Sequence, residues 1–352
     1  MTPVQFALVG AGGIAQAYAQ AFAQRPAATT LVAVVDPRTD AAAALSAGAG
    51  CPAFASVTGL LADGPPIDAA VVCTPPNTHE AVVTQLLRAG VAVLCEKPFT
   101  RTPASARRMV GEARRAGVHL TMASKFRYAA DVVAAKALVT AGTVGEVILF
   151  ENAFTGRVDM SRRWNSDPAV SGGGVLIDNG THSVDLTRYF LGPLSEVHAV
   201  EGKRVQGLPV EDTARLFVRS AAGVMGSVDL SWSIDKQLDW YVTIHGSAGT
   251  VRVGWKESRY KRAGDADWTV FGRGYDKVAS FAAQLANFAG AIRGTEELVI
   301  TADDAVASVD VIDAAYQSLA NAPWQGVGPV AGLDLTRTPA PNFARPAGVI
   351  RA

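Results

Sequence analysis

The segment Gly10 to Ala15 constrains the fold of this chain more than any other. It reads Gly-Ala-Gly-Gly-Ile-Ala and lies between an apolar run, 4–9, and a helical stretch that extends to about residue 24. In such a turn the first glycine permits the tight bend, the second lets the backbone approach a pyrophosphate, and the last position needs only a small side chain. The pattern predicts a strand, a turn and a helix whose amino end binds the phosphates of a dinucleotide. The candidate phosphate-binding residues are Gly10, Gly12, Gly13, Ile14 and Ala15.

A carboxylate follows the second predicted strand, 31–35. Asp36 stands where an acidic side chain can accept hydrogen bonds from the ribose hydroxyls of NAD and repel the 2′-phosphate of NADP. Arg38, two residues further on, could partly offset that preference. The sequence therefore favours NAD as the cofactor without excluding NADP.

Strand-like and helix-like segments alternate as far as residue 122. Apolar runs at 69–73, 91–95 and 118–123 are separated by helical stretches that end near Ala89 and Gly117. This rhythm predicts a doubly wound parallel sheet of the Rossmann type, formed by residues 1–122. The cofactor should lie at the carboxyl ends of the strands, which carry Thr74, Asn77, Glu96 and Lys97. His79, at the mouth of one turn, could contact the cofactor or cap its own helix.

Lys97 is the first candidate for chemistry. In Glu96-Lys97-Pro98 it follows a buried strand, and the proline holds the chain at a fixed bend. A lysine at this end of the sheet can hold a positive charge beside a reacting oxygen, or can be shifted toward neutrality. The alternative is a solvated lysine at the end of a strand.

The second half of the chain has a different rhythm. Strands are expected at 146–154, 213–220, 226–233, 240–245 and 250–255, with few helices between them. The pattern predicts an α+β domain, residues 123–352, with a large, open and mostly antiparallel sheet. An uncovered sheet face commonly finds a second copy, so a homo-oligomer is expected.

Asp178 and His182 form the second candidate for chemistry. A helix is expected to follow the glycines 172–174 and to end near Leu191, and it places the two side chains four residues apart on one face. An aspartate one turn before a histidine can fix the tautomer of a proton-transferring imidazole. Two other interpretations are an ion pair on the helix surface and a metal site, although no cluster of further ligands accompanies the pair.

Composition narrows the class of protein. Lysine plus arginine equals aspartate plus glutamate, 32 each, which argues against binding to nucleic acid or to an acidic membrane. No apolar stretch is long enough to span a bilayer, and the amino terminus shows no export signal. The three cysteines, Cys51, Cys73 and Cys95, are expected to be free thiols of a cytoplasmic protein.

Taken together, these motifs resemble the glucose–fructose oxidoreductase/inositol dehydrogenase (Gfo/Idh/MocA) family. The resemblance covers residues 4–192 and rests on the glycine turn, Asp36, the segment 74–80, Glu96-Lys97-Pro98, Phe126-Arg127-Tyr128 and the segment 172–182. It implies NAD(P)-dependent oxidation or reduction of a sugar, inositol or related polyol. It implies as well that the second domain, 123–352, binds the substrate and that its open sheet mediates a homodimer or homotetramer. It also implies that Lys97 assists proton movement, that His182 is the general acid/base, and that Asp178 orients His182 and contacts substrate.

Further expectations follow from this resemblance. Arg127, Tyr128 and Trp164 are expected in the substrate pocket, together with Asn179, which stands where family members often carry an apolar residue. Trp164 is followed by Asn165, whereas the family often has arginine there. Two other functions stay open, an NAD-dependent glycoside hydrolase that oxidises its substrate transiently and a non-catalytic NAD-sensing protein. The proline-rich tail, 338–346, matches no motif of the family.

Overall fold

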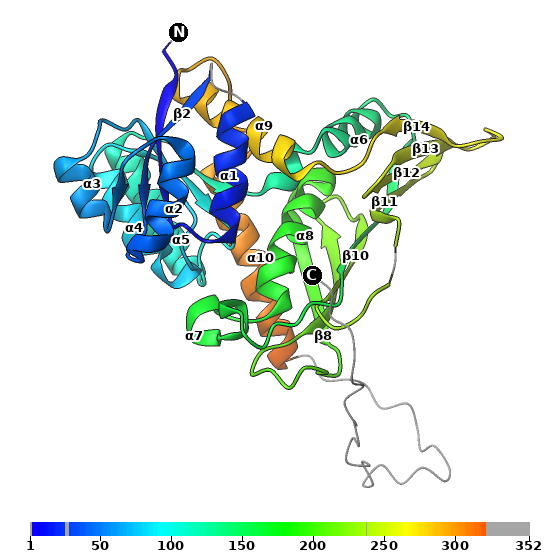
Figure 1. Ribbon diagram of the computed structural model, residues 1–352. Coiled ribbons are helices and arrows are strands. Elements are labelled where there is room, and N and C mark those ends of the chain that lie inside the picture. The colour runs from blue at the N-terminus through cyan, green and yellow to red at the C-terminus, as the bar shows by residue number, and fades with distance from the viewer. Residues whose placement is uncertain (1, 25–27, 237, 322–352) are drawn as a thin grey trace, which may run out of the picture. The chain divides into compact units, whose positions relative to one another are not determined.

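Six apolar strands form a parallel sheet in the amino-terminal part of the chain (Figure 1). The computed structural model describes residues 2–24, 28–236 and 238–321. The strand order is β3-β2-β1-β4-β5-β6. After β3 the chain crosses back over β1 to form β4, and this change in the order of the strands is typical of a Rossmann sheet. The predicted doubly wound sheet is thereby confirmed. The strands are β1 Val4–Val9, β2 Thr29–Val35, β3 Ala53–Phe54, β4 Ala69–Val72, β5 Ala92–Glu96 and β6 Leu120–Ala123.

Helices cover both faces of this sheet, which explains why its strands are apolar on both sides. In β1, Ala7 and Val9 belong to a core cluster shared with α3, α4 and α5, whereas Phe6 and Leu8 belong to a cluster shared with α1 and α2. The five helices between the strands are α1 Gly13–Gln24, α2 Thr39–Ala49, α3 Val57–Asp63, α4 Pro76–Arg88 and α5 Pro103–Ala116.

The helices α9, Lys277–Ile292, and α10, Ala302–Asn321, return to the first sheet from the far end of the chain (Figure 1). Phe281 of α9 packs against Tyr18 of α1, with ring centroids 4.4 Å apart. On α10, Asp310 accepts hydrogen bonds from Arg107 of α5. The core around the first sheet therefore draws on residues from both sides of the boundary that we propose at residue 122.

Eight strands form the second sheet, in the order β14-β13-β12-β11-β7-β10-β9-β8. All neighbours run antiparallel except β7 and β10, so the predicted large and mostly antiparallel sheet is confirmed. The strands are β7 Val147–Thr155, β8 Leu194–Glu201, β9 Thr213–Ser220, β10 Met225–Ser231, β11 Trp240–Gly246, β12 Gly249–Gly254, β13 Ser258–Arg262 and β14 Thr269–Gly272.

Helices cover one face of the second sheet. The helix α8, Val175–Leu191, lies on β7, β9 and β10, while α6, Ala130–Thr140, contacts β12 and β14. Along β9 the even-numbered residues are buried and the odd-numbered ones are not, the alternation of a sheet with one covered face. Phe217 of β9 and Met225 of β10 are large hydrophobic side chains among those left exposed. Short segments complete the structure: the 3₁₀ helices η1 Lys125–Tyr128 and η2 Trp164–Ser166, and α7 Pro168–Ser171.

Three sequence-based expectations concern the chain as a whole. Cys51, Cys73 and Cys95 form no disulfide. No helix in the described part of the chain is long and apolar enough to cross a membrane. The proline-rich segment 338–346 lies outside the described residues.

Candidate active site

The amino end of α8 is built around two glycines and a buried glutamate. A Cβ on Gly174 would lie 2.0 Å from the backbone oxygen of Glu211, and one on Gly173 would lie 1.9 Å from the hydroxyl oxygen of Tyr316. The Oε1 atom of Glu211 accepts hydrogen bonds from the backbone N–H groups of Gly174 and Leu176 and from the Tyr316 hydroxyl. Glu211 thus satisfies two N–H groups at the helix start and places a carboxylate at the positive end of the helix dipole. This arrangement fixes the helix that carries Asp178 and His182.

Lys97 and Asp178 form an ion pair across the two halves of the molecule. Lys97 follows β5, and its Nζ lies 2.5 Å from Asp178 Oδ1 and 3.2 Å from the Asp178 backbone oxygen. Both side chains are largely buried, with 17% and 16% of their surface exposed. The pair therefore joins the carboxyl end of a Rossmann strand to the first turn of α8.

His182 lies one turn further along α8 in an aromatic environment. Its ring is 6% exposed and packs edge-on against Phe126, with centroids 5.0 Å apart. Burial, aided by the positive charges of Lys97 and Lys125, holds the pKa of His182 well below its usual value. The imidazole is therefore neutral at physiological pH and able to accept a proton.

The expected contact between Asp178 and His182 is not made. Within the described ranges, Asp178 bonds to Lys97, and the Nδ1 atom of His182 is buried without a hydrogen-bond partner. An ammonium group attracts a carboxylate more strongly than a neutral imidazole does, so Lys97 takes the side chain of Asp178. The spacing of Asp178 and His182 placed both on one face of the helix, but it did not determine which group Asp178 binds.

Lys125 is a second lysine in this site and was not anticipated from the sequence. It begins η1, one residue after the end of β6, and its Nζ lies 5.4 Å from the ring centroid of Phe126 and 5.6 Å from that of Phe281. Burial and the neighbouring Lys97 lower the pKa of Lys125 to about 8. Among the residues that the structure describes, Lys125 has no hydrogen bond or ion pair.

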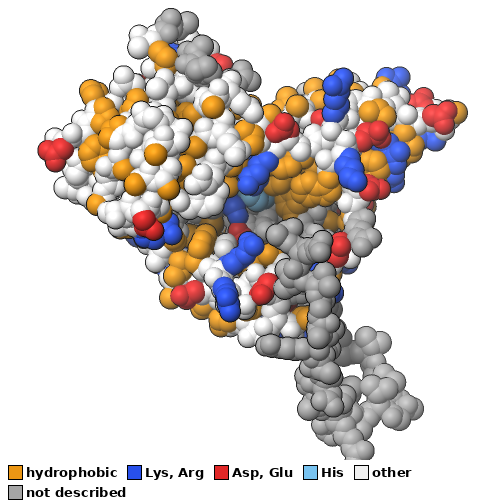
Figure 2. All heavy atoms as spheres, viewed as in Figure 1, with side chains coloured by type: hydrophobic (Ala, Val, Ile, Leu, Met, Phe, Trp, Pro, Cys, Tyr) orange, Lys and Arg blue, Asp and Glu red, His pale blue; other side chains and the backbone are white. Residues whose placement is uncertain are grey.

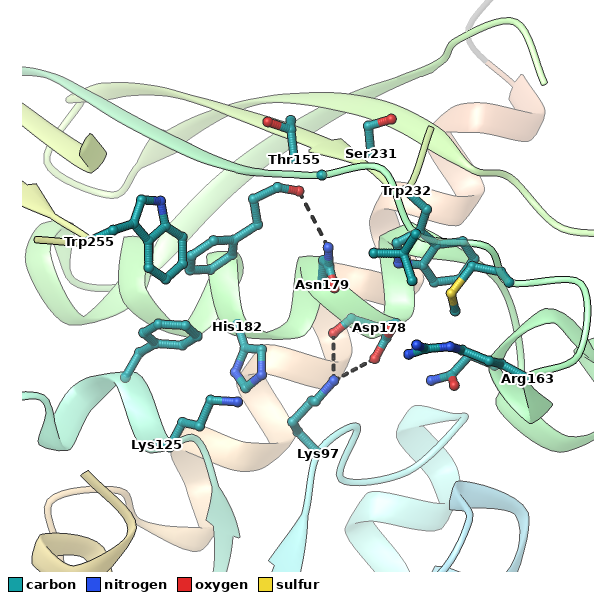
Figure 3. A pocket seen from close by; sticks show the side chains of 16 residues that line it. Lys97, Lys125, Thr155, Arg163, Asp178, Asn179, His182, Ser231, Trp232 and Trp255 are labelled. Carbon is teal, nitrogen blue, oxygen red and sulfur yellow. Dashed lines mark hydrogen bonds and ion pairs between the residues drawn. The ribbon is translucent and has the colours of Figure 1, made fainter. Parts of the chain in front are cut away.

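Lys97, Lys125, Asp178 and His182 line one pocket of about 400 Å³. Figure 2 shows the surface hollowed between the amino-terminal part and the large sheet, with hydrophobic side chains gathered on one wall. In Figure 3, Lys97 and Lys125 enter from the Rossmann side, Asp178, Asn179 and His182 from α8, and Thr155, Ser231, Trp232 and Trp255 from the sheet side. The pocket thus combines a polar floor with aromatic walls, an arrangement suited to a small polar organic ligand.

The four predicted substrate-binding residues are divided between two environments. Asn179 lines the pocket, and its Nδ2 donates to the Phe154 backbone oxygen at 3.3 Å. Arg127 is buried and its Nε donates to Asp185 at 2.9 Å, while the Tyr128 hydroxyl donates to Asn287. Trp164 is 43% exposed. Arg127, Tyr128 and Trp164 are not among the residues that line the pocket.

The glycine turn after β1 has the shape that a dinucleotide requires. Gly10 has a φ of +98°, and a Cβ on it would lie 2.8 Å from the Cys73 carbonyl carbon, so only glycine fits. A Cβ on Gly12 or Gly13 would meet no atom within 4 Å, which leaves open space beside both. Ala15 is fully buried, and Ile14 packs against the core beneath the sheet. The turn therefore offers open backbone at the amino end of α1, as a pyrophosphate site requires.

Asp36 lies at the carboxyl end of β2 beside this turn. Its carboxylate accepts hydrogen bonds from the Ala11 backbone N–H at 2.7 Å and from the side chain and backbone N–H of Arg38. Burial works against ionisation, but the hydrogen bonds from Arg38 and Ala11 outweigh it and lower the pKa of Asp36. Asp36 is thus ionised at neutral pH, as an acceptor of ribose hydroxyl groups must be.

The remaining predicted cofactor residues follow β4 and β5. The Thr74 hydroxyl accepts from Thr78, and Asn77 is exposed in the first turn of α4. His79 is fully buried with both ring nitrogens facing backbone oxygens, Nδ1 that of Phe99 and Nε2 that of Thr74. Glu96 is buried and accepts hydrogen bonds from the Tyr18 hydroxyl and the Lys97 backbone N–H. His79 and Glu96 therefore hold the segments that carry Thr74 and Lys97.

Comparison with known protein families identifies the chain. The model of the oxidoreductase family with an NAD-binding Rossmann fold, Gfo/Idh/MocA, matches residues 4–124, and that of the Gfo/Idh/MocA C-terminal domain matches residues 132–252. The chain belongs to the Gfo/Idh/MocA family. The predicted family, oxidoreductase class and NAD cofactor are thereby confirmed.

Relatives and solved structures agree with this membership. The rhizopine catabolism protein MocA of Rhizobium meliloti is 28% identical over 340 residues, 91% of this chain and 96% of that protein. An inositol 2-dehydrogenase of Rhizobium meliloti strain 1021 is 26% identical over 337 residues, 90% of this chain and 97% of that protein. The fold matches that of levoglucosan dehydrogenase in complex with NADH and levoglucosan, with a TM-score of 0.84, 21% identity, and coverage of 91% of this chain and 98% of that one.

Several pocket residues of this Gfo/Idh/MocA member lie outside the motifs that revealed the family. Lys125 directly precedes the segment Phe126-Arg127-Tyr128, and Arg163 precedes Trp164. The position of Lys125 after a predicted strand was the one signal that could have revealed it, because that strand end faces the cofactor. Phe126 and Asn165 also line the pocket; both were noted in the sequence but were not assigned to the pocket. The other lining residues that sequence reasoning missed are Phe154, Thr155, Gly156, Val158, Met160, Ser231, Trp232 and Trp255.

Proposed function

We propose that this protein transfers a hydride between NAD and a carbinol or carbonyl carbon of a sugar, inositol or related polyol. Lys97, Asp178 and His182 are its proton-transfer residues. The observation that carries this proposal is the ion pair of Lys97 with Asp178 beside the neutral His182 on the wall of one pocket. The names of an inositol 2-dehydrogenase and a levoglucosan dehydrogenase among similar proteins support the substrate class.

The cofactor would be held by the turn at Gly10, Gly12 and Gly13 and by Asp36. The nicotinamide ring supplies the acceptor of the hydride in oxidation and its donor in reduction. Lys97 follows β5, on the same edge of the sheet as the glycine turn after β1, since the strands are parallel. The carboxyl ends of the strands therefore bring the cofactor residues and the catalytic lysine to one side of the sheet.

His182 acts as the general base in oxidation. Its buried imidazole is neutral, so it can accept the hydroxyl proton of the substrate as the carbinol carbon loses its hydride. In reduction the same group returns the proton to the substrate oxygen.

Lys97 stabilises the negative charge that develops on the substrate oxygen. An ammonium has three N–H donors, and Lys97 directs two of them to Asp178. The third is left for the substrate oxygen, at a fixed position because Asp178 holds the other two. Asp178 therefore orients Lys97, and preorganised charge of this kind is a major source of rate enhancement.

A substrate panel tests the proposal. The protein is incubated with NAD and single sugars, inositols and polyols, and with NADP in parallel, while the nicotinamide absorbance is followed. We expect NADH to accumulate with at least one substrate. Binding of NAD without accumulation of NADH across the panel would contradict the proposed function and would favour a sensing protein, or a hydrolase that returns its hydride in every cycle.

We also propose that the protein is a cytoplasmic homodimer or homotetramer with its domain boundary near residue 122. One face of the second sheet is covered by no helix of the described residues, and the exposed Phe217 and Met225 on it support assembly of two copies. The three free thiols support a reducing compartment.

A further inference from the structure

The charges on the pocket wall are unequal. Its lining includes three cationic side chains, Lys97, Lys125 and Arg163, and one carboxylate, Asp178. Asp178 is already paired with Lys97. In Figure 3, Lys125 and Arg163 lie on opposite sides of this pair. Two positive charges on the wall are therefore left without a carboxylate on that wall to balance them.

Lys125 is the more constrained of these two cations. It is half-buried against Phe126 and Phe281, and burial together with Lys97 and Lys277 lowers its pKa, while Glu96 and Asp178 raise it. Glu96 attracts Lys125 from a distance but forms no ion pair with it, and its carboxylate oxygens accept from the Tyr18 hydroxyl and from the backbone N–H of Lys97. The neutral His182 adds no negative charge. In the described part of the chain, the N–H donors of Lys125 have no oxygen or nitrogen acceptor, and the ammonium lies only against the rings of Phe126 and Phe281.

A desolvated ammonium without an acceptor costs free energy. Lys125 would recover that free energy by donating to an oxyanion brought by a ligand, and charge-assisted hydrogen bonds of this kind are strong. A neutral hydroxyl group is a weaker acceptor and would leave the positive charge of the wall unbalanced. Arg163 adds to the positive potential at the other end of the pocket, although its guanidinium is exposed and screened.

We propose that the substrate of this site is an anionic sugar, and that Lys125 binds its carboxylate or phosphate beside the reacting carbinol. This inference rests on the proposed function for the location of the site. It assigns to Lys125 the role of a specificity-determining residue that distinguishes charged from neutral sugars.

Paired ligands test the inference by binding and by turnover. The pairs are galactose and galacturonate, glucose and gluconate, and glucose and glucose 6-phosphate. Each is titrated calorimetrically into the protein saturated with NADH, and each is assayed with NAD for NADH formation. For at least one pair we expect the charged member to bind about tenfold more tightly or better, and less so as salt is added. The carboxylates and the phosphate in the panel distinguish the two sources of the oxyanion.

Two variants of Lys125 provide the control. Lys125→Met is expected to reduce the preference for the charged member to about twofold or less, whereas Lys125→Arg, which keeps the charge, should retain much of it. Equal or tighter binding of the neutral member in every pair, or an unchanged preference in Lys125→Met, would overturn the inference. Absence of binding by every charged ligand would overturn it as well. If charged ligands bind through Lys125 and no NADH forms, the proposed function fails and the inference about Lys125 stands.

Discussion

At the scale of single residues, the site depends on which charged group finds which partner. Lys97 and His182 were recognised as candidates because short motifs carry them, and both line the pocket. Asp178 was recognised too, but its ion pair with Lys97 was not predicted. Lys97 comes from a distant segment of the chain, and the spacing of residues along one helix does not indicate contacts with other segments. For Lys125 the sequence offered only its position after a predicted strand, because its closeness to Phe281 and Lys97 exists only in the folded chain.

His182 should make the protein less stable in acid. Its pKa is depressed in the folded state, so below about pH 6.5, the ordinary value, the unfolded chain binds a proton that the folded chain excludes. Stability that is present above pH 6.5 is therefore lost as the pH falls toward the folded-state pKa. Urea denaturation of wild type and His182→Gln between pH 7.5 and 5 measures this, and the slope should be smaller in the variant by up to about 1.4 kcal/mol per pH unit. A remaining slope is expected in the variant, because burial lowers the pKa of His79 as well. Ser183→Ala, at a buried neighbour that does not titrate, should retain the wild-type slope; loss of that slope in Ser183→Ala would contradict the assignment.

Asp36 should select against NADP. Asp36→Ala removes the negative charge that would repel a 2′-phosphate, and it leaves Arg38 free to bind that phosphate. The ratio of kcat/KM for NAD to that for NADP should fall by about tenfold or more. Steady-state kinetics with both cofactors measures the ratio, with Asp40→Ala on α2 as the control. A ratio unchanged in Asp36→Ala would show that Asp36 does not discriminate between the cofactors.

At the scale of elements, the clearest prediction from sequence is the helix that carries the site. Glycines at 172–174 and Gly192 limit α8 to Val175–Leu191, as expected. The strands β9 and β11 were also expected, because alternating or β-branched side chains mark them. The strands β8, β13 and β14 were not expected. β13 is rich in charged residues and β14 is short, while β8 lies at the edge of the sheet and shows no regular alternation of buried and exposed residues.

The start of α8 should depend on Glu211. Glu211→Ala leaves the backbone N–H groups of Gly174 and Leu176 and the Tyr316 hydroxyl without their acceptor, at a cost of about 1–3 kcal/mol in the free energy of unfolding. Glu211→Gln keeps an acceptor oxygen and should lose less. Urea denaturation measures both, and equal losses in the two variants would contradict the role of the acceptor. Because α8 carries Asp178 and His182, kcat should fall more in Glu211→Ala than in Glu211→Gln.

At the scale of the whole molecule, the helices α9 and α10 near the end of the chain contribute to the core of the amino-terminal sheet. The alternation of strands and helices predicted the first sheet, and runs of strands predicted the second. The return of α9 to the first sheet was not predicted, because its contact with Phe6 and Tyr18 is a long-range one that leaves no local pattern. The pocket between the two sheets was not predicted in full for the same reason, because residues from both halves of the chain line it and meet only in the folded protein.

The uncovered face of the second sheet should mediate assembly. Phe217→Glu on this face is expected to shift the protein to a smaller oligomer, because a carboxylate would be desolvated in the interface. Light scattering coupled to size-exclusion chromatography measures the mass. Val133→Glu, at an exposed apolar residue of α6, is the matched control and should leave the mass unchanged. A monomeric wild type, or an unchanged mass in Phe217→Glu, would contradict assembly through this face.

The central claim is that Lys97, held by Asp178, acts on the reacting oxygen of a substrate bound next to NAD. The most direct measurement is kcat of Lys97→Ala on the best substrate of the panel, together with the Kd for NADH by fluorescence titration, with Lys261→Ala on β13 as the control. We predict a kcat lower by about 100-fold or more and a Kd for NADH within about threefold of wild type, while the control keeps both values. A near-normal kcat in Lys97→Ala would contradict the claim.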